Sequence, residues 1–278
     1  MSLKSKIQTV KFFFKPRKFV AQYKLFFGDE WLEASVDSIA KYMYKILFVI
    51  SDVAWGDDIH NPKIKGDDLT PIIEKLQAKY PGKIIVYKGS WNTQFGHVQA
   101  GLDYIKQKIP EATHCLYIDG DEIYREDQLR KLLDLSQKLK TFNAAIRINI
   151  NTYFKTINYR VLSNKEPLLL VLFPLLFWVS YRNARNVNAR IVERTDLFFE
   201  HPSYVRENDE KMRLKIMAHK ESEPILGDWY NEIWLNWSPE MKNFHPTNPS
   251  FWPAVEFVEN KNLPPEMIDA YKNFKIKG

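Results

Sequence analysis

The chain has 278 residues, of which 45% are hydrophobic and 27% are charged, a balance typical of a globular protein with a substantial core. Its formal net charge of +6 favours an anionic partner such as nucleotide phosphates, nucleic acid or acidic lipid, although a solvated basic surface explains so modest an excess equally well. The single cysteine, Cys115, excludes a disulfide framework and a cysteine-ligated zinc site.

Strand-like apolar runs alternate with segments of helical periodicity through the first half of the chain. Strands are expected at residues 19–27, 46–50, 84–87, 115–118 and 144–150. Helices are expected over residues 32–43, 70–80, 98–109 and 127–139, the second with Thr70 as its N-cap and Pro71 as its first residue. This order predicts a mainly parallel sheet with helices on both faces.

After about residue 150 the alternation is lost, and residues 229–252 contain four of the eight tryptophans. The sequences HPSY (201–204) and HPTNP (245–249) predict rigid turns. We therefore divide the chain into an α/β half, residues 1–150, and an irregular half, residues 151–278. The two halves are expected to share one sheet as one continuous domain.

The apolar segments and the N-terminal residues bear on the cellular location. The first 18 residues are basic without a long apolar stretch, so no signal peptide is expected. Residues 167–181 are strongly apolar but contain an internal proline, and a membrane-spanning helix needs about 20 residues. We expect a core element there and a cytoplasmic protein without a transmembrane span, with peripheral contact to a membrane as the alternative.

Three carboxylates within four positions follow the fourth predicted strand, in the sequence DGDE at residues 119–122. Ligands of parallel α/β sheets bind at the carboxyl ends of the strands, and Mg²⁺ or Mn²⁺ often joins one or two carboxylates to substrate phosphates. A calcium-binding EF-hand is excluded, because Tyr124 and Arg130 stand where its glycine and glutamate would be. A solvated turn stays open, but the position after an apolar run favours a ligand site.

The sequence resembles the GT-A fold glycosyltransferases, particularly the family-2-like enzymes that use nucleotide sugars. The resemblance covers residues 18 to about 150 and lies in the segments LFFGDEWLEASVDSIAKY, ILFVISD, SWNTQFGHVQAGLDYI and HCLYIDGDE. It implies a Rossmann-related, mainly parallel sheet flanked by helices, followed by an irregular C-terminal half that binds the acceptor. The QxxRW signature of processive synthases is absent from the sequence, so the resemblance implies transfer of a single sugar.

The resemblance also implies a donor site for a nucleotide sugar, with a UDP-sugar as the first choice. In this site Glu30 and Asp52 line the nucleotide pocket, and Asn92 lies near the diphosphate or the metal. Asp119 contacts the ribose or the metal, and Asp121 ligates the metal, which is expected to be Mn²⁺ or Mg²⁺.

The catalytic base is expected within residues 219–237, since acceptor activation needs a carboxylate. Asp228 is the first choice because it lies between a glycine and Trp229, and Glu232 is the alternative. An N-cap role for Asp228 stays equally open. Trp229 can stack on a sugar or a base, although core packing is the commoner fate of a tryptophan.

A histidine of the C-terminal half is expected to complete the metal site, as it often does in GT-A enzymes. His219 is the first choice, and His201 and His245 compete with it. Candidates for phosphate contacts are Arg213, Lys215 and Lys220.

Two functions of different classes follow from these features. The first is a metal-dependent glycosyltransferase whose acceptor is a hydroxymethylated DNA base, which would have to be flipped out of a duplex, or a saccharide or lipopolysaccharide. The second is a non-catalytic nucleic-acid or membrane-surface binding protein on a degenerate α/β scaffold. A nucleotidyltransferase is disfavoured, because the sequence has neither a glycine-rich phosphate loop nor a Walker lysine motif.

Overall fold

The three-dimensional structure is a computed structural model that describes residues 16–28, 30–55, 64–138, 144–163, 169–175, 179–183, 186–188, 191–220 and 225–275. The predicted alternation of the first half is confirmed. Its elements are β1 (Phe19–Leu25), α2 (Leu32–Ile39), β2 (Lys45–Ser51), α3 (Thr70–Lys79), β3 (Ile84–Gly89), α4 (Gln94–Lys108), β4 (His114–Asp119), α5 (Glu126–Lys138) and β5 (Ala144–Phe154). Leu69, and not Thr70, is the N-cap of α3, while Pro71 lies in its first turn as expected.

The second half contains more regular structure than its sequence predicts. Its elements are β6 (Tyr159–Leu162), β7 (Leu169–Pro174), β8 (Tyr181–Asn183), β9 (Asn186–Val187), β10 (Ile191–Tyr204), α6 (Asp209–Lys220), β11 (Ala254–Phe257) and α7 (Pro265–Lys275). None of the helices in the described ranges has the length and apolar composition needed to cross a membrane.

The two predicted turns of the second half have different outcomes. The turn expected at residues 201–204 is wrong, because these residues end β10, where His201 pairs with Thr152 of β5. The segment 245–249 is a turn, in which the Nδ1 atom of His245 accepts hydrogen bonds from the backbone N–H groups of Thr247 and Asn248, both at 3.1 Å.

Among the described residues, nine strands form one sheet in the order β11-β6-β5-β7-β4-β1-β2-β3, with β10 beside β5. The pairs β1–β2, β1–β4, β2–β3 and β5–β10 are parallel. Strand β7 runs antiparallel between β4 and β5, and β6 runs antiparallel to β5 and β11. The sheet is therefore mixed, and the predicted parallel arrangement is confirmed for most of its central strands. The described part of the apolar segment 167–181 contributes β7, whose Leu172 and Phe173 are buried, so this segment is a core element.

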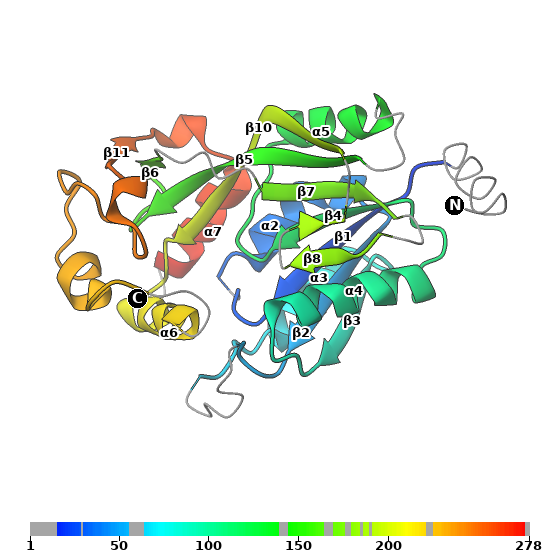
Figure 1. Cartoon of the computed structure of the whole chain (residues 1–278), viewed down its shortest axis with the longest axis horizontal. Helices are drawn as coiled ribbons and strands as arrows, with labels where there is room; N and C mark the ends of the chain where they lie inside the picture. Colours follow the sequence, from blue (N-terminus) through cyan, green and yellow to red (C-terminus); the bar gives the residue numbers. More distant parts are fainter. Residues whose placement is uncertain are drawn as a thin grey trace.

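Helices cover both faces of the sheet, because side chains alternate between the faces along each strand. On β1, Ala21 and Tyr23 face the layer formed by α2, α3 and α5. Val20 faces the opposite layer, which contains α4 and the β8–β9 hairpin, and Cys115 is buried in that layer. Figure 1 shows α4 beside β1 to β3, and β6, β11 and α6 at the opposite end of the molecule.

The last helix ties the C-terminal half to the first. The ring of Phe274 on α7 meets the ring of Trp31, at the start of α2, edge to face at 5.0 Å. The indole N–H of Trp31 donates to the carbonyl oxygen of Val205 at 2.9 Å. The segment that follows β10 is therefore held against the start of α2.

Candidate functional site

Two turns meet at the carboxyl ends of the parallel strands β1 and β4. Lys24 pairs with Asp119 in the strand register, so both strands end at the same level. Gly28 has a φ of +138°, and a Cβ atom added to it would lie 3.8 Å from the Cα of Gly120. A Cβ atom on Gly120 would lie only 3.1 Å from Leu25. The close contact of the two turns brings Glu30 and Asp121, which follow these glycines, to one edge of the sheet.

Strand β10 reaches the same edge through two backbone hydrogen bonds. The N–H of Ile123 donates to the carbonyl of Glu200, and the N–H of Glu200 donates to the carbonyl of Ile123, both at 2.9 Å. This bridge brings the next residue of β10, His201, beside the DGDE turn. Its Nε2 atom lies 3.2 Å from Oδ1 of Asp121.

Arg206 joins the two turns through a buried ion pair with each. Its guanidinium lies 2.8 Å from a carboxylate oxygen of Glu30 and 3.0 Å from Oδ2 of Asp121. The side chains of Arg206 and Glu30 are only 6% and 3% exposed. Glu30 also accepts a hydrogen bond from the backbone N–H of Glu207, so Glu30 anchors the segment after β10. The predicted role of Glu30 in lining the nucleotide pocket stays a prediction.

Asp121 carries its negative charge although it is buried. Burial alone would raise the pKa of its carboxyl group, but the neighbouring basic side chains of His201, Lys215 and Arg206 hold that pKa well below the usual range. Asp121 is therefore the point at which three basic side chains from β10, α6 and their connection converge.

Lys215 of α6 is the second cation beside Asp121, with its Nζ atom 3.6 Å from Oδ2. The ammonium also donates to the carbonyl oxygen of Ser203 at 2.8 Å and to the hydroxyl of Ser203. Burial, reinforced by repulsion from Arg206, lowers the pKa of Lys215 to about 7.

The other two candidates for phosphate contacts gain no support from the structure. Arg213 pairs with Glu210 on the exposed face of α6, and the side chain of Lys220 lies outside the described residues.

Asp119 forms an ion pair with Lys24 of β1. The Nζ atom of Lys24 lies 3.4 Å from Oδ1 of Asp119 and 4.8 Å from the centre of the Trp55 ring. It also donates to the side-chain oxygen of Gln94, the first residue of α4, at 3.4 Å. The edge therefore holds three acids and three bases, which we call the strand-end charge cluster: Glu30, Asp119, Asp121, Lys24, Arg206 and Lys215.

The predicted metal site depends on which acids and histidines lie close together. In the part of the chain that the structure describes, no three histidine, cysteine, aspartate or glutamate side chains are arranged so that they could hold a metal ion. Asp121 and His201 do adjoin, however, with Nε2 of His201 at 3.2 Å from Oδ1 of Asp121. One carboxylate and one imidazole suit Mg²⁺ or Mn²⁺ when substrate oxygens and water fill the other positions. The residues thus fit a metal ion that binds together with an anionic substrate.

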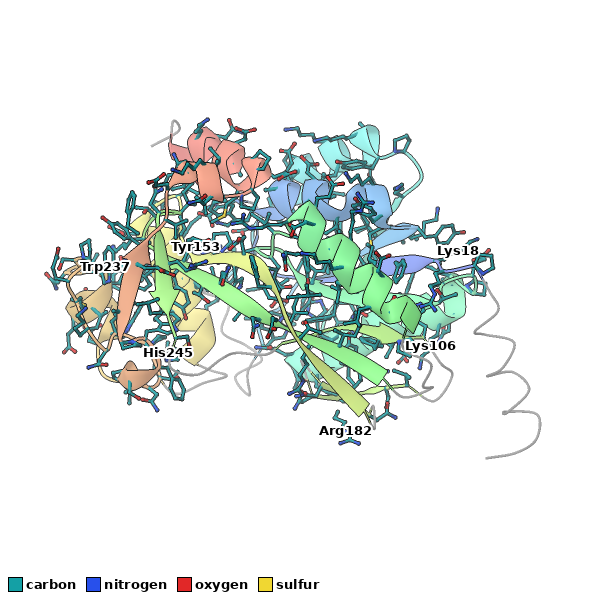
Figure 2. All side chains as sticks on the ribbon, turned by 90° about the horizontal axis from the view of Figure 1, so that it is seen from above. Lys18, Lys106, Tyr153, Arg182, Trp237 and His245 are labelled. Carbon is teal, nitrogen blue, oxygen red and sulfur yellow. The ribbon has the colours of Figure 1, made fainter. Side chains whose placement is uncertain are left out.

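His201 is the histidine that the structure places at this edge, beside Asp121. His219 lies in the last turn of α6, and its side chain is outside the described residues. His245 lies with Trp237 at one end of the molecule, opposite Lys18 and Lys106 (Figure 2). Proximity to Asp121 thus favours His201 over His245.

Asp52 and Asn92 lie at the ends of the neighbouring strands β2 and β3, where the resemblance places the nucleotide. Both side chains are exposed, and the N–H of Asp52 donates to the carbonyl of Gly89 at 3.1 Å. The aromatic side chains around them were not predicted from the sequence. The Trp55 indole N–H contacts Nδ1 of His97 at 3.2 Å, and Trp91 stacks on His97 at 4.7 Å.

The segment with the predicted catalytic base packs against α6 through a hydrogen bond of 2.9 Å from the indole of Trp234 to Asp209. Asp228 and Glu232 are both exposed. Asp228 accepts a hydrogen bond of 2.7 Å from the side chain of Asn231, and its other oxygen faces the Asn231 N–H at 3.4 Å. The second contact resembles a helix cap, but the N-cap of the following turn, Tyr230–Trp234, is Trp229.

Trp229 is a core residue. It is 3% exposed, its rings lie about 6.0 Å from those of Phe154 and Tyr204, and its N–H donates to the carbonyl of Phe244 at 2.8 Å. Stacking of Trp229 on a sugar would require this contact to open, so its predicted donor-binding role has no support from its position.

The chain is similar to solved structures but matches no curated protein by sequence. Neither a protein-family model nor a curated protein sequence matches the chain. The similar solved structures include 4-diphosphocytidyl-2C-methyl-D-erythritol synthase from Anaerococcus prevotii, with 15% identity, coverage of 76% of this chain and 96% of that chain, and a TM-score of 0.40. They also include S. aureus TarS 1–349 in complex with UDP-GlcNAc, with 12% identity, coverage of 73% and 66%, and a TM-score of 0.42.

Proposed function

We propose that the chain is a glycosyltransferase that takes a single sugar from a nucleotide-sugar donor, with a UDP-sugar as the first choice. The observation that supports this proposal is the strand-end charge cluster at the carboxyl ends of β1 and β4. Ligands of mainly parallel α/β sheets bind at this edge. Paired acids and bases there suit a diphosphate accompanied by a divalent cation.

In this proposal each part of the site has a separate task. Asp121 and His201 would hold Mn²⁺ or Mg²⁺, which when bound offsets the negative charge of the leaving diphosphate. Asp52 and Asn92, exposed at the ends of β2 and β3, contact the nucleotide. Asp228 takes the proton of the acceptor hydroxyl, because its carboxylate is exposed to solvent.

The acceptor that we propose is a hydroxyl group of a saccharide or lipopolysaccharide, or of a hydroxymethylated base in DNA. The net charge of +6 favours an acceptor with phosphate groups. A DNA acceptor would lose affinity steeply as the salt concentration rises, whereas a neutral saccharide would not. The salt dependence therefore separates a DNA acceptor from a neutral saccharide.

The function is tested by incubating the protein with a panel of nucleotide sugars and Mn²⁺ or Mg²⁺, and measuring release of the free nucleotide. We expect at least one donor to be hydrolysed. Asp121→Asn should lower the rate by about 100-fold, since it removes one charged contact to the metal that stabilises the leaving diphosphate. Asp228→Asn should abolish sugar transfer to an acceptor while leaving the donor affinity unchanged, because its role is in proton transfer.

Circular dichroism of both variants shows whether they fold. Release of no nucleotide from any donor, together with unchanged DNA or vesicle binding by folded Asp121→Ala, would instead support the non-catalytic binding protein. If Glu232→Gln abolishes transfer and Asp228→Asn does not, the base is Glu232.

A further inference from the structure

We propose that Lys215 is the resident counter-ion of Asp121, and that it changes partner from this carboxylate to the donor diphosphate when the donor enters with a divalent cation. The inference rests on the proposed function for the identity of the donor. It adds a role for Lys215 that couples the binding of the cation to the binding of the nucleotide. The contacts around Asp121 carry the argument.

The two buried cations beside Asp121 are held very differently. Arg206 is fixed by Glu30 at 2.8 Å, by Asp121 at 3.0 Å and by the carbonyl of Ser203 at 3.0 Å. Lys215 approaches Asp121 only to 3.6 Å, and its hydrogen bonds are to the carbonyl and hydroxyl of Ser203. Lys215 can therefore leave Asp121 and keep its neutral partners, whereas Arg206 cannot leave without breaking a pair with each turn.

The weak hold on Lys215 matters because both ligands of the proposed site are charged. The strand-end charge cluster contains three acidic and three basic side chains, and His201 lies beside it. A divalent cation alone would add positive charge to this edge, and a diphosphate alone would add negative charge. In a largely buried site either addition is costly, but the two ligands together add little net charge. Lys215 opposes the cation and attracts the phosphate, so it strengthens this coupling in both directions.

The place of Lys215 in the fold suits such a change of partner. Its side chain comes from α6 and is 11% exposed, more than that of Arg206 at 6%. Its ammonium also lies 5.1 Å from the centre of the Tyr204 ring, a contact that stabilises the cation without fixing its direction. A lysine ammonium on a flexible stem adapts to a new anion more easily than a planar guanidinium does.

The metal arm of the experiment measures the binding of Mn²⁺ alone, by electron paramagnetic resonance of the free ion, to the wild-type chain and to Lys215→Met. Removing the competing ammonium should raise the affinity for Mn²⁺ by about tenfold, within the usual range of coupling between two sites. Lys215→Arg keeps the positive charge and should retain the weak wild-type affinity.

Lys211→Met is the matched control, because Lys211 lies one turn earlier on α6 and pairs with Glu207 at 3.4 Å. It removes the same charge from the same helix and should change the Mn²⁺ affinity by less than about twofold. Equal affinities of the wild type and Lys215→Met, or an equal gain in Lys211→Met, would overturn the proposal. If circular dichroism shows that Lys215→Met does not fold, Lys215→Gln takes its place, since its amide can keep a hydrogen bond to Ser203.

The nucleotide arm measures the binding of UDP by calorimetry in the presence of saturating Mn²⁺. Lys215→Met should bind UDP about tenfold more weakly than the wild type, because the phosphate loses one cationic partner. Equal UDP affinities would contradict the transfer of Lys215 to the phosphate. Failure of every variant and of the wild type to bind UDP would count against the proposed donor, while the metal arm would still decide whether Lys215 competes for Asp121.

Discussion

His97 shows how a single buried side chain organises the edge where the nucleotide is expected. Its Nε2 atom faces the carbonyl oxygen of Val49 at 2.8 Å and must donate, so Nδ1 is left to accept from the indole of Trp55 at 3.2 Å. Only the neutral ring can donate at one nitrogen and accept at the other. Burial, partly opposed by the Val49 carbonyl, accordingly lowers the pKa of His97 to about 4.

The lowered pKa predicts acid destabilisation. The unfolded chain binds a proton at His97 near pH 6.5, whereas the folded protein binds it only near pH 4. The stability that neutral His97 contributes is therefore fully present above pH 6.5 and is lost as the pH falls towards 4. The slope is at most ~1.4 kcal/mol per pH unit. Urea unfolding at several pH values should show this slope in the wild type.

His97→Gln should lose that part of the slope, because a glutamine does not titrate. His114, which is also buried with a pKa lowered to about 3, remains in both proteins and provides the common background. An identical pH dependence of the two unfolding free energies would show that His97 is not the group responsible.

At the residue scale the sequence locates the acids of the site better than its bases. Asp119 and Asp121 follow an apolar run and are found by their position alone. Nothing local marks Lys24 or Arg206, since they meet these acids only through the pairing of β1 with β4 and the docking of the segment after β10. The histidine could not be chosen either, because the selection of His201 depends on its bridge to the turn.

Helix α4 is the element that fixes the opposite face of the sheet. A Cβ atom on Gly101 would lie 2.5 Å from the side-chain nitrogen of Gln22 and 2.7 Å from a methyl group of Val49. The side chain of Gln22 in turn donates to the carbonyl of Val98 at 2.7 Å. The helix therefore approaches β1 and β2 as closely as a glycine permits.

Overpacking a buried contact usually costs about 1–3 kcal/mol, and alanine regains about 1 kcal/mol of helix propensity. Gly101→Ala should therefore destabilise the protein by up to about 2 kcal/mol. Chemical denaturation measures the difference. Gln107→Ala, on the exposed face of the same helix, should change the unfolding free energy by less than about 0.5 kcal/mol, and a Gly101→Ala protein as stable as the wild type would show that the helix can shift outwards.

At the element scale, the strands and helices of the first half are predictable because their periodicity is strong. Strand β10 was missed in part because Pro202 suggested a turn. The strand tolerates this proline at an irregularity in its register between His201 and Tyr204, where a lost ladder hydrogen bond costs little. Such an irregularity depends on the pairing with β5, so it cannot be recognised from the sequence of β10 alone.

In the whole molecule, the two halves of the chain are parts of one sheet. Strands β7 and β10 of the second half pair with β4 and β5 of the first, and α7 packs on α2 through Phe274 and Trp31. The hydrophobic pattern of the sequence changes near residue 150, but strands from before and after this point pack in the same sheet.

The shared sheet predicts that the chain unfolds in one cooperative transition. Five of the eight tryptophans lie within residues 151–278, so tryptophan fluorescence reports mainly on the second half. Far-ultraviolet circular dichroism reports on the helices of both. The urea midpoints from the two signals should coincide, and a fluorescence transition at a clearly lower urea concentration would show that the second half unfolds separately.

The two hydrogen bonds between Ile123 and Glu200 have an evolutionary consequence. They join main-chain atoms, so the spacing between positions 121 and 201 is set without help from the side chains found there. A descendant of this chain could exchange the aspartate or the histidine for other reactive groups and inherit the alignment unchanged. The side chains at this edge can thus change during evolution while the backbone positions that carry them stay the same.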